Sequence, residues 1–93
     1  MKISDYYLNQ PATFENRLLY AMYLSPYDCN ADYKWGYLDA SKELLESHRD
    51  IEWLVEYIKG YEAINSNPDD YTKAYILAYK DYIKQEKESV TNE

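Results

Sequence analysis

The 93-residue chain contains little glycine, proline or cysteine, and each shortage excludes a class of structure. With two glycines and no Asn-Gly or Asp-Gly pair, the sequence lacks the usual signals of β-hairpins. The single cysteine, Cys29, excludes an internal disulfide framework, so nothing requires an oxidising compartment. No apolar run reaches the ~20 residues of a membrane-spanning helix, and the N-terminal residues lack the apolar core of a signal peptide. We therefore expect a soluble, cytoplasmic protein, which for a viral protein means the host cytoplasm.

Tyrosine and negative charge are abundant. Tyrosine supplies 13 of the aromatic side chains, beside two tryptophans and one phenylalanine. A buried tyrosine keeps a partner or water for its hydroxyl, so the core is expected to be tyrosine-rich and partly polar. A hydrophobic content of 46% suits one small domain over residues 1–93. A net charge of −7 disfavours direct binding to nucleic acid or to an anionic membrane, because both require lysine and arginine.

The spacing of apolar residues predicts an all-α fold, a compact bundle of three to four helices. The main helices are expected over residues 11–24, from Asn30 or Asp32 to about Ser47, over 48–64, and from 68 to about 88, with a short turn near 4–8 and a frayed tail after about 88. Pro11 fits the first turn of the first main helix, and Asn67 with Pro68 predicts the start of the last. Ser47 and Asp50 resemble a capping box, which would separate the two middle segments. One long bent helix remains the alternative, because no glycine or proline lies between them.

The stretch DCNADYKWGYLD raises the question of a calcium loop. Its candidate ligands are Asp28, Asn30, Asp32 and Asp39, at positions 1, 3, 5 and 12 of a helix–loop–helix calcium site. Position 6, which needs glycine for a sharp turn, is Tyr33. A turn followed by a helix capped by Asn30 or Asp32 requires no strain, and is therefore the favoured interpretation. The calcium-responsive module is kept as an alternative.

The residues that could carry catalysis are sparse. Cys29 and His48 are the only candidates for a thiol–imidazole pair, and a lone cysteine and a lone histidine in a small domain are usually incidental. There is no glycine-rich phosphate loop and no clustered histidine. We therefore predict that the protein is not an enzyme and needs no cofactor.

The negative charge is concentrated in the middle of the chain. Residues 32–70 carry ten acidic and four basic side chains, a net charge of −6. In a continuous helix, the spacings of 7, 4, 3 and 4 between the first five of these acids would align them on one face. Like charges four residues apart repel, so such a face costs local stability and could serve a partner. The predicted partner-binding residues are Asp32, Asp39, Glu43, Glu46, Asp50, Glu52 and Glu56.

In size, charge and lack of catalytic residues, the chain resembles small acidic phage proteins that inhibit host nucleases or defence complexes, including anti-restriction and anti-CRISPR proteins. Some of these imitate DNA. The resemblance implies an inhibitor that blocks a basic, nucleic-acid-binding surface of a host protein. Charge reversal at Glu43 and Glu46 is then expected to abolish binding without unfolding the domain. The alternative is a helical scaffold or adaptor that binds through a Tyr/Trp surface including Trp35 and Trp53. A homodimer is also expected, because it would bury more of a small core.

Overall fold

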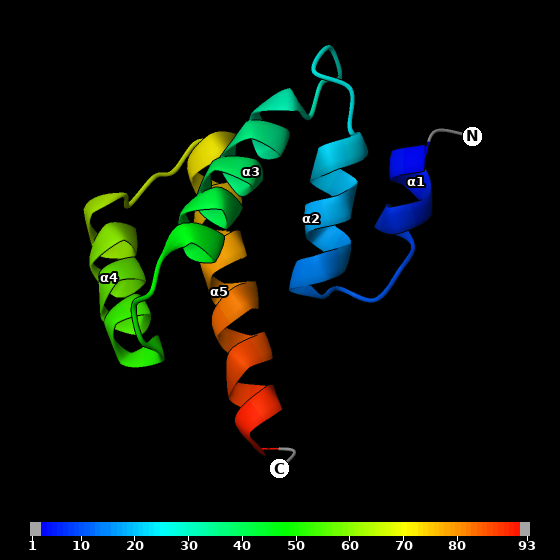
Figure 1. Cartoon of the computed structure of the whole chain (residues 1–93). Helices are drawn as coiled ribbons and strands as arrows, with labels where there is room; N and C mark the ends of the chain where they lie inside the picture. Colours follow the sequence, from blue (N-terminus) through cyan, green and yellow to red (C-terminus); the bar gives the residue numbers. More distant parts are fainter. Residues whose placement is uncertain (1–2, 92–93) are drawn as a thin grey trace.

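Residues 3–91, which the computed structural model describes, form five helices and no strand (Figure 1). The helices are α1 (Ile3–Leu8), α2 (Phe14–Tyr23), α3 (Ala31–Glu46), α4 (Ile51–Ile64) and α5 (Asp70–Thr91). The all-α expectation is confirmed, and the predicted turn near residues 4–8 is a short helix. The last helix extends to Thr91, beyond the predicted fraying point near residue 88.

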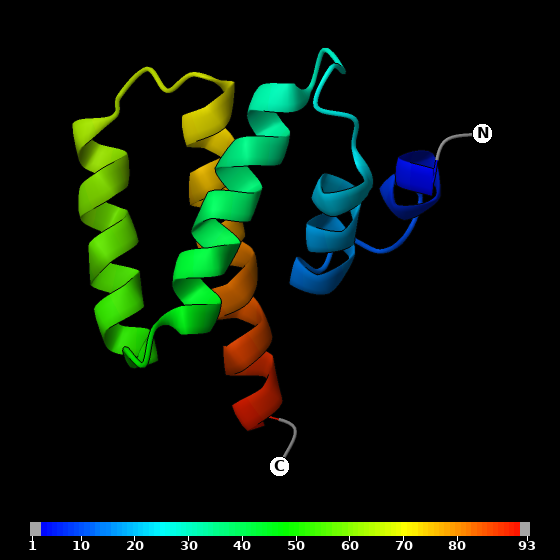
Figure 2. The same ribbon diagram turned by 45° about the horizontal axis from the view of Figure 1, so that its top comes forward.

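Helix α5 is the hub of the bundle. It packs most extensively against α3, and it also contacts α4 and α2. Figures 1 and 2 show α4, α3, α2 and α1 in this order across the molecule, with α5 behind α3. Helix α1 reaches the bundle through its contacts with α2.

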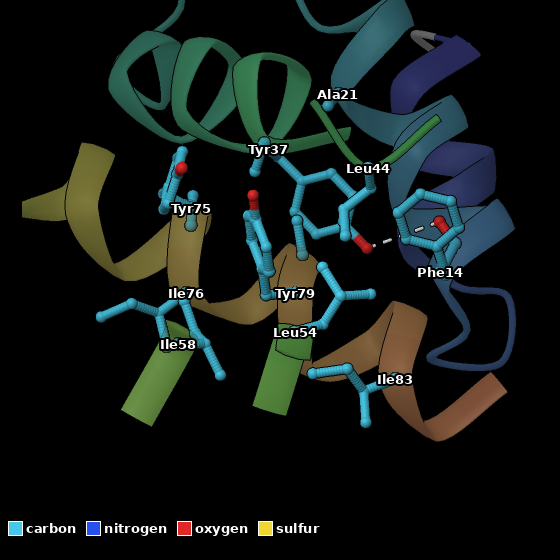
Figure 3. Close-up of a cluster of buried hydrophobic side chains, with 13 residues drawn as sticks. Phe14, Ala21, Tyr37, Leu44, Leu54, Ile58, Tyr75, Ile76, Tyr79 and Ile83 are labelled. Atoms are coloured by element: carbon cyan, nitrogen blue, oxygen red, sulfur yellow. Dashed lines mark hydrogen bonds between the residues drawn. The ribbon is translucent and has the colours of Figure 1, made fainter. Parts of the chain in front are cut away.

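The core lies where α2, α3 and α4 meet α5, and it mixes large aromatic with very small side chains (Figure 3). Tyr37 of α3 is fully buried and packs against Phe14 of α2, with ring centroids 6.1 Å apart. Small residues let the helices come close: a Cβ atom built on Gly36 would lie 2.2 Å from the backbone oxygen of Tyr71 on α5. The buried alanines of the core are Ala21, Ala40, Ala74 and Ala78.

Two helices begin at caps other than those predicted from the sequence. Thr13 caps α2, because its side-chain oxygen accepts the N–H of Asn16 at 3.1 Å; Pro11 therefore lies outside the helix. Asp69 accepts the N–H of Thr72 at 2.8 Å at the start of α5. The prediction of Asn67 as cap was therefore wrong by two residues. An aspartate cap provides a charged acceptor at the positive end of the helix dipole, which explains the later start.

The middle of the chain forms two helices, so the single bent helix was wrong. Ser47 ends α3 in an extended conformation, and its hydroxyl accepts the N–H of Arg49 at 3.1 Å. Asp50 is the cap of α4, with its carboxylate 2.8 Å from the N–H of Trp53. Two large apolar residues, Met22 of α2 and Leu45 of α3, are exposed.

Candidate functional site

The acidic flank of α3 is formed by Asp32, Asp39, Glu43 and Glu46. Their spacing of 7, 4 and 3 places them along one side of the helix, and all four residues are exposed. This part of the sequence prediction matches the helical register.

Two members of the acidic flank are bonded to tyrosines of α5. The Tyr71 hydroxyl donates to Asp39 at 2.6 Å. Glu43 accepts from the hydroxyl of Tyr79 at 3.0 Å and from that of Tyr75. Figure 3 shows the side chains of Tyr75 and Tyr79 rising from α5 toward α3. Glu43 therefore stabilises the α3–α5 interface, and reversing its charge would disturb the fold as well as any binding. It is unsuitable for the binding test proposed from the sequence.

Aromatic side chains of α4 lie beside these carboxylates. The hydroxyls of Tyr57 and Tyr75 are 3.0 Å apart, and the ring of Tyr61 lies 4.9 Å from that of Tyr75. Trp53 stacks on Tyr57 at 5.2 Å, and the guanidinium of Arg49 lies 4.6 Å from the Trp53 ring. Acidic groups of α3 and aromatic groups of α4 and α5 thus form one continuous acid–tyrosine cluster.

The electrostatics of the cluster keep its tyrosines protonated. The hydrogen bond to Asp39 raises the pKa of Tyr71 to about 12. Burial is the main cause of the raised pKa of Tyr75 and of Tyr79, and the bonds to Glu43 add to it. These hydroxyls are therefore hydrogen-bond donors at neutral pH, and the carboxylates are their acceptors.

Within residues 3–91, the side chains of Asp50, Glu52 and Glu56 make no hydrogen bond to the tyrosines of this cluster. Asp50 is occupied as the cap of α4. Glu52 and Glu56 border a shallow hollow on the other side of α4, together with Val55 and Lys87. The break between α3 and α4 ends the shared face that one continuous helix would have provided. The seven acids are therefore distributed over the acidic flank of α3, the α3–α4 turn and the outer side of α4.

The candidate calcium ligands are not brought together. The Asp28 carboxylate accepts the N–H of Asn30 at 3.0 Å and the thiol of Cys29 at 3.4 Å, which forms a local turn. Helix α3 begins at Ala31, so Asp39 lies ~12 Å further along the helix axis, bonded to Tyr71. Among residues 3–91, no group of three His, Cys, Asp or Glu side chains is arranged to hold a metal ion. The favoured turn-and-helix interpretation is right about where the helix starts, although the Asn30 side chain makes no capping bond.

The candidate thiol and imidazole are separated by the whole of α3. Cys29 precedes the helix and His48 follows it, and both are exposed. Sixteen helical residues span ~24 Å, so the two side chains cannot form a catalytic pair.

Sequence reasoning missed a buried cation. Lys34 on α3 is only 7% exposed, and its Nζ donates to the carbonyl oxygens of Ala21 at 2.9 Å and Met22 at 3.2 Å. These carbonyls end α2, where a positive charge complements the helix dipole. The spacing of three and four residues between Lys34, Tyr37 and Ser41 places Lys34 on the inner face of the helix. This spacing could have predicted its burial.

No family model matches this chain, and no curated protein or solved structure does either. Within residues 3–91, no helix combines the length and the apolar character needed to cross a membrane.

Proposed function

We propose that this protein is an acidic binding protein that occupies a basic, nucleic-acid-binding surface of another protein and blocks it. The acidic flank of α3 provides the charge, and the aromatic residues beside it provide the contacts that anchor the complex. The observation that carries the proposal is the exposed row of four carboxylates next to Trp53 and Tyr57.

The two ends of the acidic flank are suited to a partner. Asp32 and Glu46 are exposed, and neither carboxylate makes a hydrogen bond or an ion pair within the part of the chain that the structure describes. Asp39 and Glu43 use one side of each carboxylate for tyrosine hydroxyls, and both residues remain exposed to solvent. Tyrosine bonds hold these two carboxylates in place, which lowers the entropy lost on binding.

The spacing of the carboxylates is compatible with a surface built for a phosphate chain. Four acids over fifteen residues of helix span ~21 Å, an average step of ~7 Å. Phosphates of one DNA strand step ~3.4 Å along the duplex axis, so the acids correspond to about every second phosphate. A row of lysines and arginines that binds phosphates could pair with this flank.

An aromatic scaffold is the second candidate, and the exposure of large side chains favours it. Trp35 is 46% exposed, Trp53 is 42% exposed and Tyr27 is 95% exposed. Tryptophan and tyrosine are enriched among residues that dominate binding energy at protein interfaces. In this version the acidic charge maintains solubility, and binding tolerates salt.

The first experiment is capture of partners from host lysate with the tagged protein, with elution by a salt gradient and identification by mass spectrometry. A nuclease or other nucleic-acid-binding protein that is released at moderate salt would support the blocking function. A partner that resists salt and has no basic surface would favour the aromatic scaffold.

A matched pair of variants then tests the acidic flank directly. Asp32→Lys with Glu46→Lys should abolish capture of a basic partner, because it reverses both unbonded ends of the flank. Glu15→Lys with Glu86→Lys makes the same change in net charge on α2 and α5 and should leave capture intact. Equal loss in both variants would indicate a general charge effect, and no loss in the first would refute the flank mechanism. Circular dichroism of each variant establishes that the helices remain.

A further inference from the structure

A lysine face lies on the opposite side of α4 and α5 from the acid–tyrosine cluster. It consists of Lys73, Lys80, Lys84 and Lys87 of α5 and Lys59 of α4. The four α5 lysines are spaced by 7, 4 and 3 residues, which aligns them on one side of the helix. The last 23 residues have no net charge, because four acids offset these lysines. The net charge of this segment therefore gives no indication of the lysine face, which follows only from the spacing of the lysines along the helix.

The lysine face is hollowed. One hollow of about 430 Å³ is bordered by Glu62, Pro68, Lys73 and Leu77. A second hollow of about 420 Å³ lies next to it, over Val55, Ile58 and Ile83. Both hollows share Glu62 and Lys80, whose ion pair of 2.8 Å joins α4 to α5 between them. The surface is thus a continuous trough with an apolar floor and charged sides.

The two sides of the trough carry opposite charge. The α5 side carries the four lysines and one acid, Glu88, whose carboxylate lies 4.0 Å from Lys84, so its net charge is positive. The α4 side carries three acids, Glu52, Glu56 and Glu62, with Lys59 between them. An entirely acidic or entirely basic partner would meet repulsion on one side. A surface with the same arrangement of charge, rotated by 180°, would place its basic side against this acidic side and its acidic side against this basic side. Both sides would then attract.

We propose that the lysine face binds a second copy of this chain in a two-fold symmetric dimer. A two-fold axis parallel to the helices places α4 of each copy over α5 of the other. The Glu62–Lys80 ion pair indicates that these two residues lie at the same level along the trough. Glu62 of each copy then faces Lys80 of the other, Glu56 faces the level between Lys84 and Lys87, and Glu52 lies about one helical turn beyond it. The half-buried Leu77 and Val55 border the two hollows and add apolar area on either side of the ion pair.

The net charge of the chain also favours this face. Two molecules with a charge of −7 repel one another over most of their surfaces. The lysine face is where basic residues gather, so two copies can approach there with the least repulsion. Helix α4 is ~21 Å long, and two adjacent helices are ~20 Å wide, so the footprint is small for a stable interface. We therefore expect a weak dimer whose population rises with protein concentration.

A charge-swap experiment tests the proposal with the full chain. Sedimentation velocity over a concentration series should show a monomer–dimer equilibrium for the wild type. Lys84→Glu with Lys87→Glu places acid against acid, and Glu52→Lys with Glu56→Lys places base against base. Each variant alone should be monomeric at concentrations where the wild type is dimeric. A mixture of the two should form a heterodimer, detected by native mass spectrometry, because acids then face bases in both halves of the contact.

The control variant is Lys42→Glu with Arg49→Glu, which makes the same charge change on α3 and in the α3–α4 turn. It should dimerise like the wild type. A wild-type protein that is monomeric throughout, or a mixture that fails to form the heterodimer, would overturn the proposal. Dimerisation that is lost equally in the control would also overturn it. If a double variant loses helical circular dichroism, the single changes Lys84→Glu and Glu56→Lys repeat the same test.

Discussion

Arg17 of α2 donates from one guanidinium nitrogen to both carboxylate oxygens of Asp81 on α5, at 2.9 and 2.8 Å. The Tyr37 hydroxyl of α3 donates to the same carboxylate at 2.9 Å. The Asp81 side chain is only 11% exposed. A single carboxylate therefore connects three helices that are far apart in the sequence.

Replacing this carboxylate should destabilise the protein more than breaking an exposed ion pair. Asp81→Asn removes the negative charge to which Arg17 and Tyr37 donate hydrogen bonds. We expect a loss of about 2 kcal/mol in the free energy of unfolding. Glu62→Gln breaks the exposed pair with Lys80 and should cost less than about 1 kcal/mol. Urea unfolding followed by circular dichroism measures both values. Equal losses would mean that the three-helix connection adds nothing beyond an ordinary surface pair.

The two glycines should respond in opposite directions to alanine. In Gly36→Ala, the added methyl group collides with the backbone of Tyr71, so α3 and α5 must move apart. We expect a loss of at least about 2 kcal/mol. At Gly60 an added Cβ would meet no atom within 4 Å apart from its chain neighbours and the backbone of its own helix, so Gly60→Ala should stabilise helix α4 by about 0.5–1 kcal/mol. Thermal unfolding of the two variants decides the matter, and a stable Gly36→Ala protein would contradict the close helix contact.

Glu43 should matter as a hydrogen-bond acceptor. Glu43→Ala leaves the hydroxyls of Tyr75 and Tyr79 without this acceptor, and about 2 kcal/mol of stability should be lost. Glu43→Gln keeps an acceptor oxygen and should lose less. Near-ultraviolet circular dichroism should report the changed tyrosine environment in the alanine variant first. If both variants unfold alike, the negative charge matters more than the acceptor.

Alkaline solution should unfold the protein as its tyrosines ionise. The pKa of Tyr33, raised mainly by burial, and that of Tyr71, raised by its bond to Asp39, are both about 12, against 10.0 for an unperturbed tyrosine. The folded state holds these protons more tightly than the unfolded state does. The stabilisation that these two protonated tyrosines give the folded state is therefore complete below about pH 10. It is lost as the pH rises from 10 through 12. Tyrosinate absorbance and helical circular dichroism should change together above pH 10; complete ionisation near pH 10 with intact helices would contradict this.

Local signals in the sequence predicted the helices well, and contacts between distant residues were beyond them. The apolar spacing located α2 to α5 within a few residues, because each helix must bury one stripe. The sequence could not distinguish Asn67 from Asp69 as the cap of α5, because asparagine and aspartate are both favoured at the N-cap of a helix. The Arg17–Asp81 pair joins residues 64 positions apart, and no periodicity encodes such a pairing.

The candidate site was predicted in part for the same reason. The acidic flank follows from helical register alone, so Asp32, Asp39 and Glu46 share the predicted side of α3. The bonds of Glu43 to α5 depend on how two helices pack, so its structural role could not be foreseen. The lysine stripe of α5 was detectable from its spacing, but the balanced charge of the last segment concealed it.

The position of α5 as both the hub of the bundle and the last helix has a consequence for synthesis. Helices α2, α3 and α4 all pack on it, and six residues of the core cluster belong to it. These six residues are Ala74, Tyr75, Ile76, Ala78, Tyr79 and Ile83. Until α5 has been translated, α4 lacks its only helix partner within residues 3–91 and α3 lacks its largest one, so their apolar stripes stay open to chaperones. We therefore expect this fold to form in one step after α5 emerges, and not progressively along the nascent chain.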